Sequence, residues 1–134
     1  MDRLNKLQPL ALLLLRLALG LVFFTHGFAK VANLTQASEM FGKMGFPGWV
    51  GVLIALLEVI GGVLLIIGLF TRIMGLIFAG EMAVAILRVH WAQAPWWQLN
   101  SYELALVCGA GSFVLAAFGA GILSIDEAVF HRRR

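Results

Sequence analysis

Charged residues are scarce in this chain. Of its 134 residues, 13% are charged and 61% are hydrophobic, whereas about a quarter of the residues in an ordinary soluble domain are charged. A soluble domain of this length needs charge to keep its surface in water. The composition therefore excludes an ordinary soluble domain and indicates a single domain that lies in a lipid bilayer.

Cysteines and cofactor motifs are almost missing as well. The single cysteine, Cys108, cannot form an internal disulfide and lies in an apolar run, so we expect a buried packing residue. No CxxC, CxxCH or HExxH motif occurs, so we assign no metal site. No nucleophile–base pair stands out, and an enzyme acting alone is the least supported class. The net charge of +3 comes without a basic run interleaved with aromatic residues, so we expect no nucleic-acid partner.

Four long apolar segments are the main feature that the sequence does contain. Each is close to the roughly 20 residues that cross a bilayer core of about 30 Å. Backbone groups in hydrocarbon must be satisfied locally, which favours helices. We therefore predict an all-α fold, an integral membrane four-helix bundle in which residues 1–134 form one domain. The predicted helices span about residues 10–29, 50–70, 73–91 and 102–123.

The first apolar segment could also be a signal peptide. Arg16 interrupts it, and no small-residue cleavage site follows it. We therefore expect a membrane helix that is retained.

Three connections of unequal length join the predicted helices. Residues 29–49 are long enough to hold a short amphipathic or re-entrant segment. Only Thr71 and Arg72 separate the second and third helices, which predicts a tight antiparallel hairpin. Residues 91–101 carry three tryptophans, which are typical of a membrane interface.

Lysine and arginine residues predict the orientation, because they concentrate in cytoplasmic segments. The N-terminus, the second connection and the C-terminus share one side, which holds Arg3, Lys6, Arg72 and Arg132 to Arg134. The other side holds Lys30 and Lys43, with Arg88 at a helix end. We predict a multi-pass protein of the inner (plasma) membrane, with both termini cytoplasmic and the tryptophan-rich loop outside.

Four charged residues lie at membrane depth, namely Arg16, Glu58, Glu81 and Arg88. A charge at the bilayer centre costs about 2.5 kcal/mol or more, so we expect these side chains to face the bundle interior and pair. The depth of each residue in the membrane and the direction in which its side chain leans favour a pair between Glu58 and Arg88. A pair between Arg16 and either Glu81 or Glu58 is the alternative.

Helical spacing places these charges on faces that small residues mark as internal. The expected stripes are Arg16, Gly20, Phe23, Gly27 and Lys30; Gly51, Ala55, Glu58 and Gly62; Glu81, Ala85 and Arg88; and Cys108, Ser112, Ala116 and Ala120.

Two interpretations of the buried charges stay open. Ion pairs can fix helix register without any chemistry. Alternatively, Glu58, Glu103, His26 and Arg88 line an outward-opening pocket that holds a quinone headgroup or passes protons. His26 and His90 raise the further alternative of a metal or haem site. His90 should point away from the face of Glu81 and Arg88 if its helix continues regularly.

Several motifs together resemble the DoxX family over about residues 12–126. They are residues 14–20 (LLRLALG), 24–30 (FTHGFAK), 58–62 (EVIGG), 68–72 (GLFTR), 102–103 (YE) and 119–126 (GAGILSID). Ala120 departs from the pattern, because many members have proline there.

The resemblance implies a four-helix bacterial membrane protein. Some members are subunits of quinone-linked sulfur-oxidising or terminal oxidase systems, and others belong to oxidative-stress complexes. Distant relatives act as chaperones or cargo receptors. The matching positions to test are Arg16, His26, Lys30, Glu58, Tyr102 and Glu103.

Taken together, we expect a redox-associated membrane subunit that anchors an oxidoreductase partner. A quinone is the expected cofactor, and a homo-oligomer is a further expected assembly. An outward-facing polar cleft would bind the quinone or pass protons, using His26, Lys30, Glu58, Arg88, Tyr102 and Glu103. The alternatives are a scaffold or chaperone without chemistry and a small transporter or proton pathway.

Overall fold

The computed structural model describes residues 2–130, and within that range the chain is helical without strands. The basic residues Arg132 to Arg134 of the orientation prediction lie outside the described residues. The longer helices are α2 (Gln8–Ala32), α3 (Leu34–Lys43), α4 (Gly48–Ile67), α5 (Thr71–Val84) and α7 (Glu103–Phe118). The shorter elements are α1 (Asp2–Asn5), the π-helix η1 (Ala85–His90), α6 (Trp91–Gln93), the 3-10 helix η2 (Leu99–Ser101) and α8 (Ile125–Phe130).

Three helical stretches are long and apolar enough to cross a membrane, namely Gln8–Ala32, Gly48–Ile67 and Thr71–Gln93. The predicted fourth span, residues 102–123, is shorter in the structure because α7 ends at Phe118. Gly119 and Gly121 have φ angles of 90° and 72°. These left-handed conformations end the helix. The all-α fold is therefore confirmed, and among the described residues three of the four predicted spans are long and apolar enough to cross a membrane.

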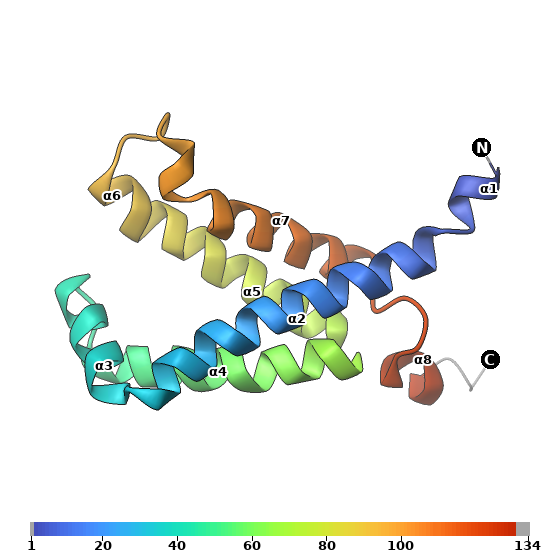
Figure 1. Ribbon diagram of the computed structural model, residues 1–134, viewed down its shortest axis with the longest axis horizontal. Coiled ribbons are helices and arrows are strands. Elements are labelled where there is room, and N and C mark those ends of the chain that lie inside the picture. Colours follow the sequence, from blue (N-terminus) through green and yellow to red (C-terminus); the bar gives the residue numbers. More distant parts are fainter. Residues whose placement is uncertain (1, 131–134) are drawn as a thin grey trace.

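The long helices form two pairs, with α2 packed along α4 and α5 packed along α7. Figure 1 shows α4 and α5 meeting at one end of the molecule and diverging toward the end that carries α3 and α6. The predicted tight hairpin is therefore wrong. The turn is formed by residues 68–70, Thr71 and Arg72 already belong to α5, and α4 and α5 share few contacts.

Glycines allow α2 and α4 to approach closely along the predicted stripes. Arg16, Gly20, Phe23 and Gly27 are buried on α2, and the α4 stripe is buried throughout. A Cβ atom on Gly27 would lie 2.6 Å from Val59 N, and one on Gly62 would lie 2.6 Å from Phe24 N. Such distances leave no room for a side chain, so backbone-to-backbone packing holds this pair together.

The core between the two pairs is apolar. Phe23 of α2 and Phe78 of α5 stack with their ring centroids 3.8 Å apart, and both are almost fully buried. Leu65 and Leu115 are fully buried in the same core. This stack joins the two pairs near the middle of the bundle.

The connection between α2 and α4 contains α3, as expected for an amphipathic segment. The Asn33 side chain accepts a hydrogen bond from Gln36 N and so caps the start of α3. Ala37 is buried against Gly51, which fixes α3 on α4. The helix α3 therefore covers the N-terminal end of α4 (Figure 1).

Candidate functional site

A cavity of about 690 Å³ lies between the two helix pairs at the end where they diverge. Its walls come from α2, α3, α4, α5, η1 and α7 and are mostly apolar. The titratable side chains that line it, besides Cys108, are His26, Lys30, Glu58, Glu81, His90, Tyr102 and Glu103. The fold thus brings together five of the six residues expected in the polar cleft and adds Glu81 and His90.

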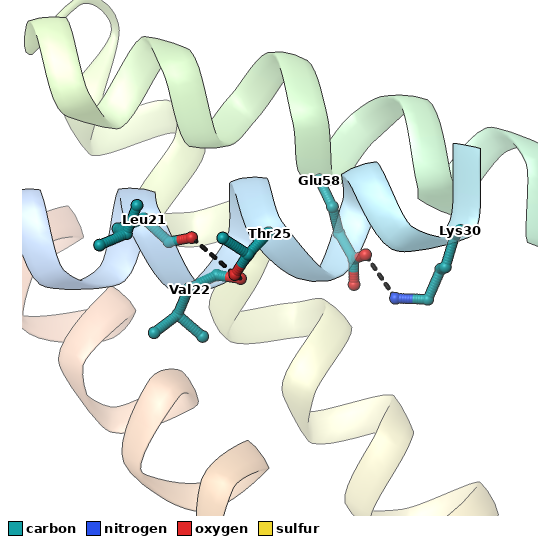
Figure 2. A network of polar contacts seen from close by, with 5 residues as sticks. All are labelled: Leu21, Val22, Thr25, Lys30 and Glu58. Carbon is teal, nitrogen blue, oxygen red and sulfur yellow. Dashed lines mark hydrogen bonds and ion pairs between the residues drawn. The ribbon is translucent and has the colours of Figure 1, made fainter. Parts of the chain in front are cut away.

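An ion pair between Lys30 and Glu58 crosses one side of the cavity. Lys30 Nζ donates a hydrogen bond to Glu58 Oε2 at 2.5 Å. The Glu58 side chain is 5% exposed and that of Lys30 is 20% exposed. Figure 2 shows the two side chains leaving α4 and α2 on the same side and meeting at their tips.

The neighbouring glycine explains why this pair forms. Gly27 lies one helical turn before Lys30, and the Glu58 Cβ lies directly over it. The Glu58 side chain can therefore pass across α2 and reach the Lys30 ammonium. The hydroxyl of Thr25 instead donates to Leu21 O and Val22 O within its own helix (Figure 2).

The predicted partner of Glu58, Arg88, lies elsewhere. Arg88 is exposed and does not line the cavity, whereas Val89 and His90 do. Residues 85–90 form a π-helix, in which each residue turns less around the axis than in an α-helix. The lag accumulated over this segment turns Arg88 away from the face of Glu81 and turns His90 toward it. The π-helix therefore explains why both Arg88 and His90 point in other directions than the sequence predicted.

Glu81 lines the same cavity as the Lys30–Glu58 pair. Glu81 Oε2 is buried and has no hydrogen-bond partner among the described residues. The alternative pair that the sequence left open, Arg16 with either Glu81 or Glu58, does not form among the described residues.

The mouth and the floor of the cavity differ in character. His26 and Glu103 are exposed on its lining at the outer end, and the Tyr102 hydroxyl donates to Trp96 O at 2.5 Å. Phe23, which stacks on Phe78, forms part of the floor. The cavity is therefore polar toward its mouth and closed by aromatic rings toward the core.

Arg16 fastens the opposite end of the bundle, at the turn between α4 and α5. Its side chain is 1% exposed, and its guanidinium donates to Ala120 O and Leu123 O at 2.9 Å each. Carbonyl groups after the end of α7 thus replace the predicted carboxylate partners, because the chain turns back there. Arg16 is therefore a structural residue of this end and lies outside the cavity.

Two further residues complete this inner clasp, which we define as Arg16, Arg72 and Asp126. The Asp126 carboxylate accepts hydrogen bonds from Phe70 N and Thr71 N and so caps the start of α5. Arg72 donates to Ala116 O and Ala117 O at the end of α7. Sequence reasoning noted the segments 68–72 and 119–126 only as motifs. One signal could have suggested that the two segments meet. The start of α5 has no capping side chain next to it in the sequence, and Asp126 is a residue type that caps helices.

The comparisons with known proteins agree with this architecture. The family model described as DoxX matches residues 11–91. "Putative oxidoreductase CatD" of Bacillus subtilis (strain 168) is 35% identical over 130 residues, covering 97% of this chain and 95% of the relative. "Inner membrane protein YqjF" of Escherichia coli (strain K12) is 28% identical over 123 residues, covering 92% and 95%.

A third relative, from Haemophilus influenzae (strain ATCC 51907 / DSM 11121 / KW20 / Rd), is 34% identical over 136 residues and covers 98% of this chain and 100% of its own. No solved structure gives a significant match. The family model covers more than half of the chain, and the arrangement of apolar helices is that of a membrane protein. The chain therefore belongs to the DoxX family of membrane proteins.

Proposed function

We propose that this protein is an inner-membrane subunit of a redox system that binds the ring of a membrane quinone in the outer cavity and anchors an oxidoreductase partner. The observation that carries the proposal is the cavity itself. It combines apolar walls with a few convergent polar side chains, and its volume of about 690 Å³ is in the usual range for a small-molecule site. A quinone has the matching chemistry, because its flat apolar ring carries two carbonyl groups.

The polar residues have distinct roles in this proposal. Lys30, Glu58 and Glu81 meet the quinone ring inside the cavity. His26, Tyr102 and Glu103 lie toward the mouth, where protons can exchange with water. The name of the Bacillus relative, an oxidoreductase, supports a redox setting. The names of two Escherichia coli relatives support an inner-membrane location.

One observation weakens the rival role as a conduit. A transporter or proton pathway needs a polar route across the bundle. The stacked rings of Phe23 and Phe78 and the apolar core around them lie between the cavity and the inner clasp. The scaffold or chaperone role remains as the second candidate, because Arg16 and Arg72 hold the fold together without any ligand.

Native mass spectrometry of the protein, extracted from its own membranes in mild detergent, tests the proposal. We expect co-released quinone with the wild-type protein and a loss of that quinone with Glu58→Gln. The exposed carboxyl group of Glu39 on α3 is the matched control, and Glu39→Gln should keep the quinone. A homo-oligomer that carries only phospholipid in all three samples would refute quinone binding and favour the scaffold.

A further inference from the structure

We propose that the cavity opens sideways between α4 and α5, at Gly80, and that the hydrocarbon tail of its ligand leaves through this opening into the lipid. The ligand class that follows is a quinone with a long isoprenoid tail, which enters from the bilayer rather than from water. The identity of the ring rests on the proposed function. The opening is a feature of the protein alone and is tested without any quinone.

The boundary between α4 and α5 is not closed by helix packing. Each helix packs along another partner, α4 against α2 and α5 against α7, and the two share few contacts. Figure 1 shows them meeting at their turn and then diverging toward α3 and α6. Side chains therefore decide whether the cavity is closed on this side.

Two glycines show where this boundary is filled and where it is open. A Cβ atom on Gly61 of α4 would clash with the side chains of Met74 and Phe78 of α5. A Cβ atom on Gly80 of α5 would meet nothing within 4 Å, although Gly80 lines the cavity. The boundary is therefore filled with side chains at Gly61 and empty beside Gly80.

The residues around Gly80 belong to the cavity and to the outer surface at once. Ile77 and Val84 lie one helical turn before and after Gly80, and all three residues line the cavity. Gly80 is exposed, Ile77 is 40% exposed and Val84 is 48% exposed. The stretch Thr71–Gln93 is long and apolar enough to cross a membrane, so its exposed side chains face lipid. These residues therefore form the edge of an opening that joins the cavity to the hydrocarbon.

The charged groups of the cavity do not block this edge. The Glu58 side chain is 5% exposed and is paired with Lys30. The Glu81 Oε2 atom is buried. The exposed ionisable residues of the lining, His26 and Glu103, belong to α2 and α7 rather than to α4 or α5. The edge at Gly80 is therefore apolar, which suits a hydrocarbon chain and excludes a charged one.

The size of the cavity indicates the same ligand class. A volume of about 690 Å³ suits a quinone ring with the first part of its tail. A long isoprenoid tail does not fit beside the ring, so the rest of it has to leave through a wall. An apolar opening lets the tail do so without exposing hydrocarbon to water. The tail then stays in lipid while the ring lies inside the cavity.

Photolabelling of the full-length protein in lipid nanodiscs tests the opening without a quinone. The probe is a phospholipid with a diazirine at the end of one acyl chain, and peptide mass spectrometry locates the labels. In the wild-type protein we expect labels at Val22, which lines the cavity from α2, and at Phe113, which is exposed on α7 and does not line the cavity. Gly80→Phe should lower the labelling of Val22 by about tenfold and leave that of Phe113 unchanged.

Two further variants control for the added ring. Gly42 on α3 also has open space around it and does not line the cavity, so Gly42→Phe should leave the labelling of Val22 unchanged. Val84→Trp fills the opening from the next helical turn and should lower the labelling of Val22 as Gly80→Phe does. Labelling of Val22 that survives in both Gly80→Phe and Val84→Trp would overturn the lateral opening, and so would its absence in the wild-type protein.

Binding of two quinones in mild detergent then tests the route of the tail. The probes are a benzoquinone with a decyl tail and the same ring without a tail, and native mass spectrometry counts the bound molecules. Gly80→Phe should weaken binding of the tailed quinone by about tenfold and leave that of the tail-less ring unchanged, because only the tail passes the opening. Equal binding of the tailed quinone to the wild-type and Gly80→Phe proteins would overturn this route. Failure of the wild-type protein to bind either quinone would refute the proposed function, while the labelling of Val22 would still decide the opening.

Discussion

Lys30 lies near the outer end of α2, where a lysine side chain would ordinarily extend toward the headgroups. In the structure its ammonium instead reaches inward to Glu58. The reason is the bare surface of Gly27, one turn earlier, over which Glu58 crosses from α4. The sequence placed both residues correctly on internal faces, but it could not show that Lys30, rather than Arg88, was within reach.

Arg16 shows a second case in which the type of partner was unexpected. A buried arginine was expected to need a carboxylate, yet two backbone carbonyls of the segment after α7 accept from it. Asp126 supplies negative charge only from a greater distance. Backbone carbonyl groups in an irregular segment still need donors when they are buried, and the Arg16 guanidinium supplies them.

We therefore predict that Arg16→Met destabilises the protein by about 3 kcal/mol, since two charge-assisted hydrogen bonds are lost and two carbonyl groups are left without donors. The free energy of unfolding in detergent, measured by titration with denaturant, checks this value. Arg72→Met is the matched control. Like Arg16, Arg72 donates to two backbone carbonyl groups, but Arg72 is exposed, so water can take its place. Equal losses in the two variants would contradict the role of burial.

At the scale of single elements, Gly27 of α2 and Gly80 of α5 differ in their surroundings. A Cβ atom on Gly27 would meet Val59 N, Glu58 Cβ and Ala55 O within 2.9 Å. A Cβ atom on Gly80 would meet nothing within 4 Å. The same substitution should therefore have opposite effects at the two positions.

We predict that Gly27→Ala lowers stability by about 1–3 kcal/mol, because α2 must move away from α4. Gly80→Ala should be neutral or stabilising by up to about 1 kcal/mol, because alanine favours the helix more than glycine does. Thermal unfolding in the same detergent compares the two variants. A Gly27→Ala protein as stable as the wild type would contradict the close approach of the two helices. The movement of α2 should also weaken the Lys30–Glu58 pair.

The π-helix η1 is the element that most changes the candidate site. It places His90 on the cavity wall and leaves Arg88 exposed. In a regular α-helix Arg88 would lie on the face of Glu81 and His90 on the opposite side. Its sequence, AILRVH, carries no glycine or proline that would mark an irregular turn. The local sequence therefore gives no signal that would predict the widened turn.

Spin labels test this rotation directly. In a Cys108→Ala background, a label at Arg88→Cys should be more accessible to oxygen dissolved in the lipid than a label at His90→Cys. Leu76→Cys, on the exposed face of α5, provides the lipid-facing reference. The opposite order at positions 88 and 90 would indicate a regular α-helix and would return Arg88 to the cavity.

At the scale of the whole molecule, the two helix pairs are fastened at one end and separated at the other (Figure 1). The inner clasp joins the turn between α4 and α5 to the segment that follows α7. The cavity lies at the opposite end, beneath α3 and the tryptophan-rich loop. A change in the angle between the pairs would therefore alter the cavity while leaving the clasp in place.

The orientation in the membrane stays a prediction that is independent of the site. Figure 1 places α1 and α8 at the same end of the molecule, as two cytoplasmic termini require. We expect a fluorescent reporter fused after Arg134 to fold in the cytoplasm and a phosphatase fused there to stay inactive. A cysteine in place of Trp97 should react with a membrane-impermeant thiol reagent added from outside. A phosphatase active at the C-terminus would invert the cavity and place its mouth in the cytoplasm.

The amino-acid sequence by itself determined the membrane class, the approximate positions of the long helices and the internal faces of α2 and α4. These features depend on composition and on the helical period, which act locally along the chain. Only the tertiary structure decided that Glu58 pairs with Lys30, that Arg16 binds carbonyl groups and that His90 replaces Arg88 at the cavity. Those outcomes depend on the close approach at Gly27, the turn after Phe118 and the widened turn of η1. Gly119 and Gly121 mark the turn after Phe118 locally, but which distant side chain meets the carbonyl groups there depends on how the helices pack.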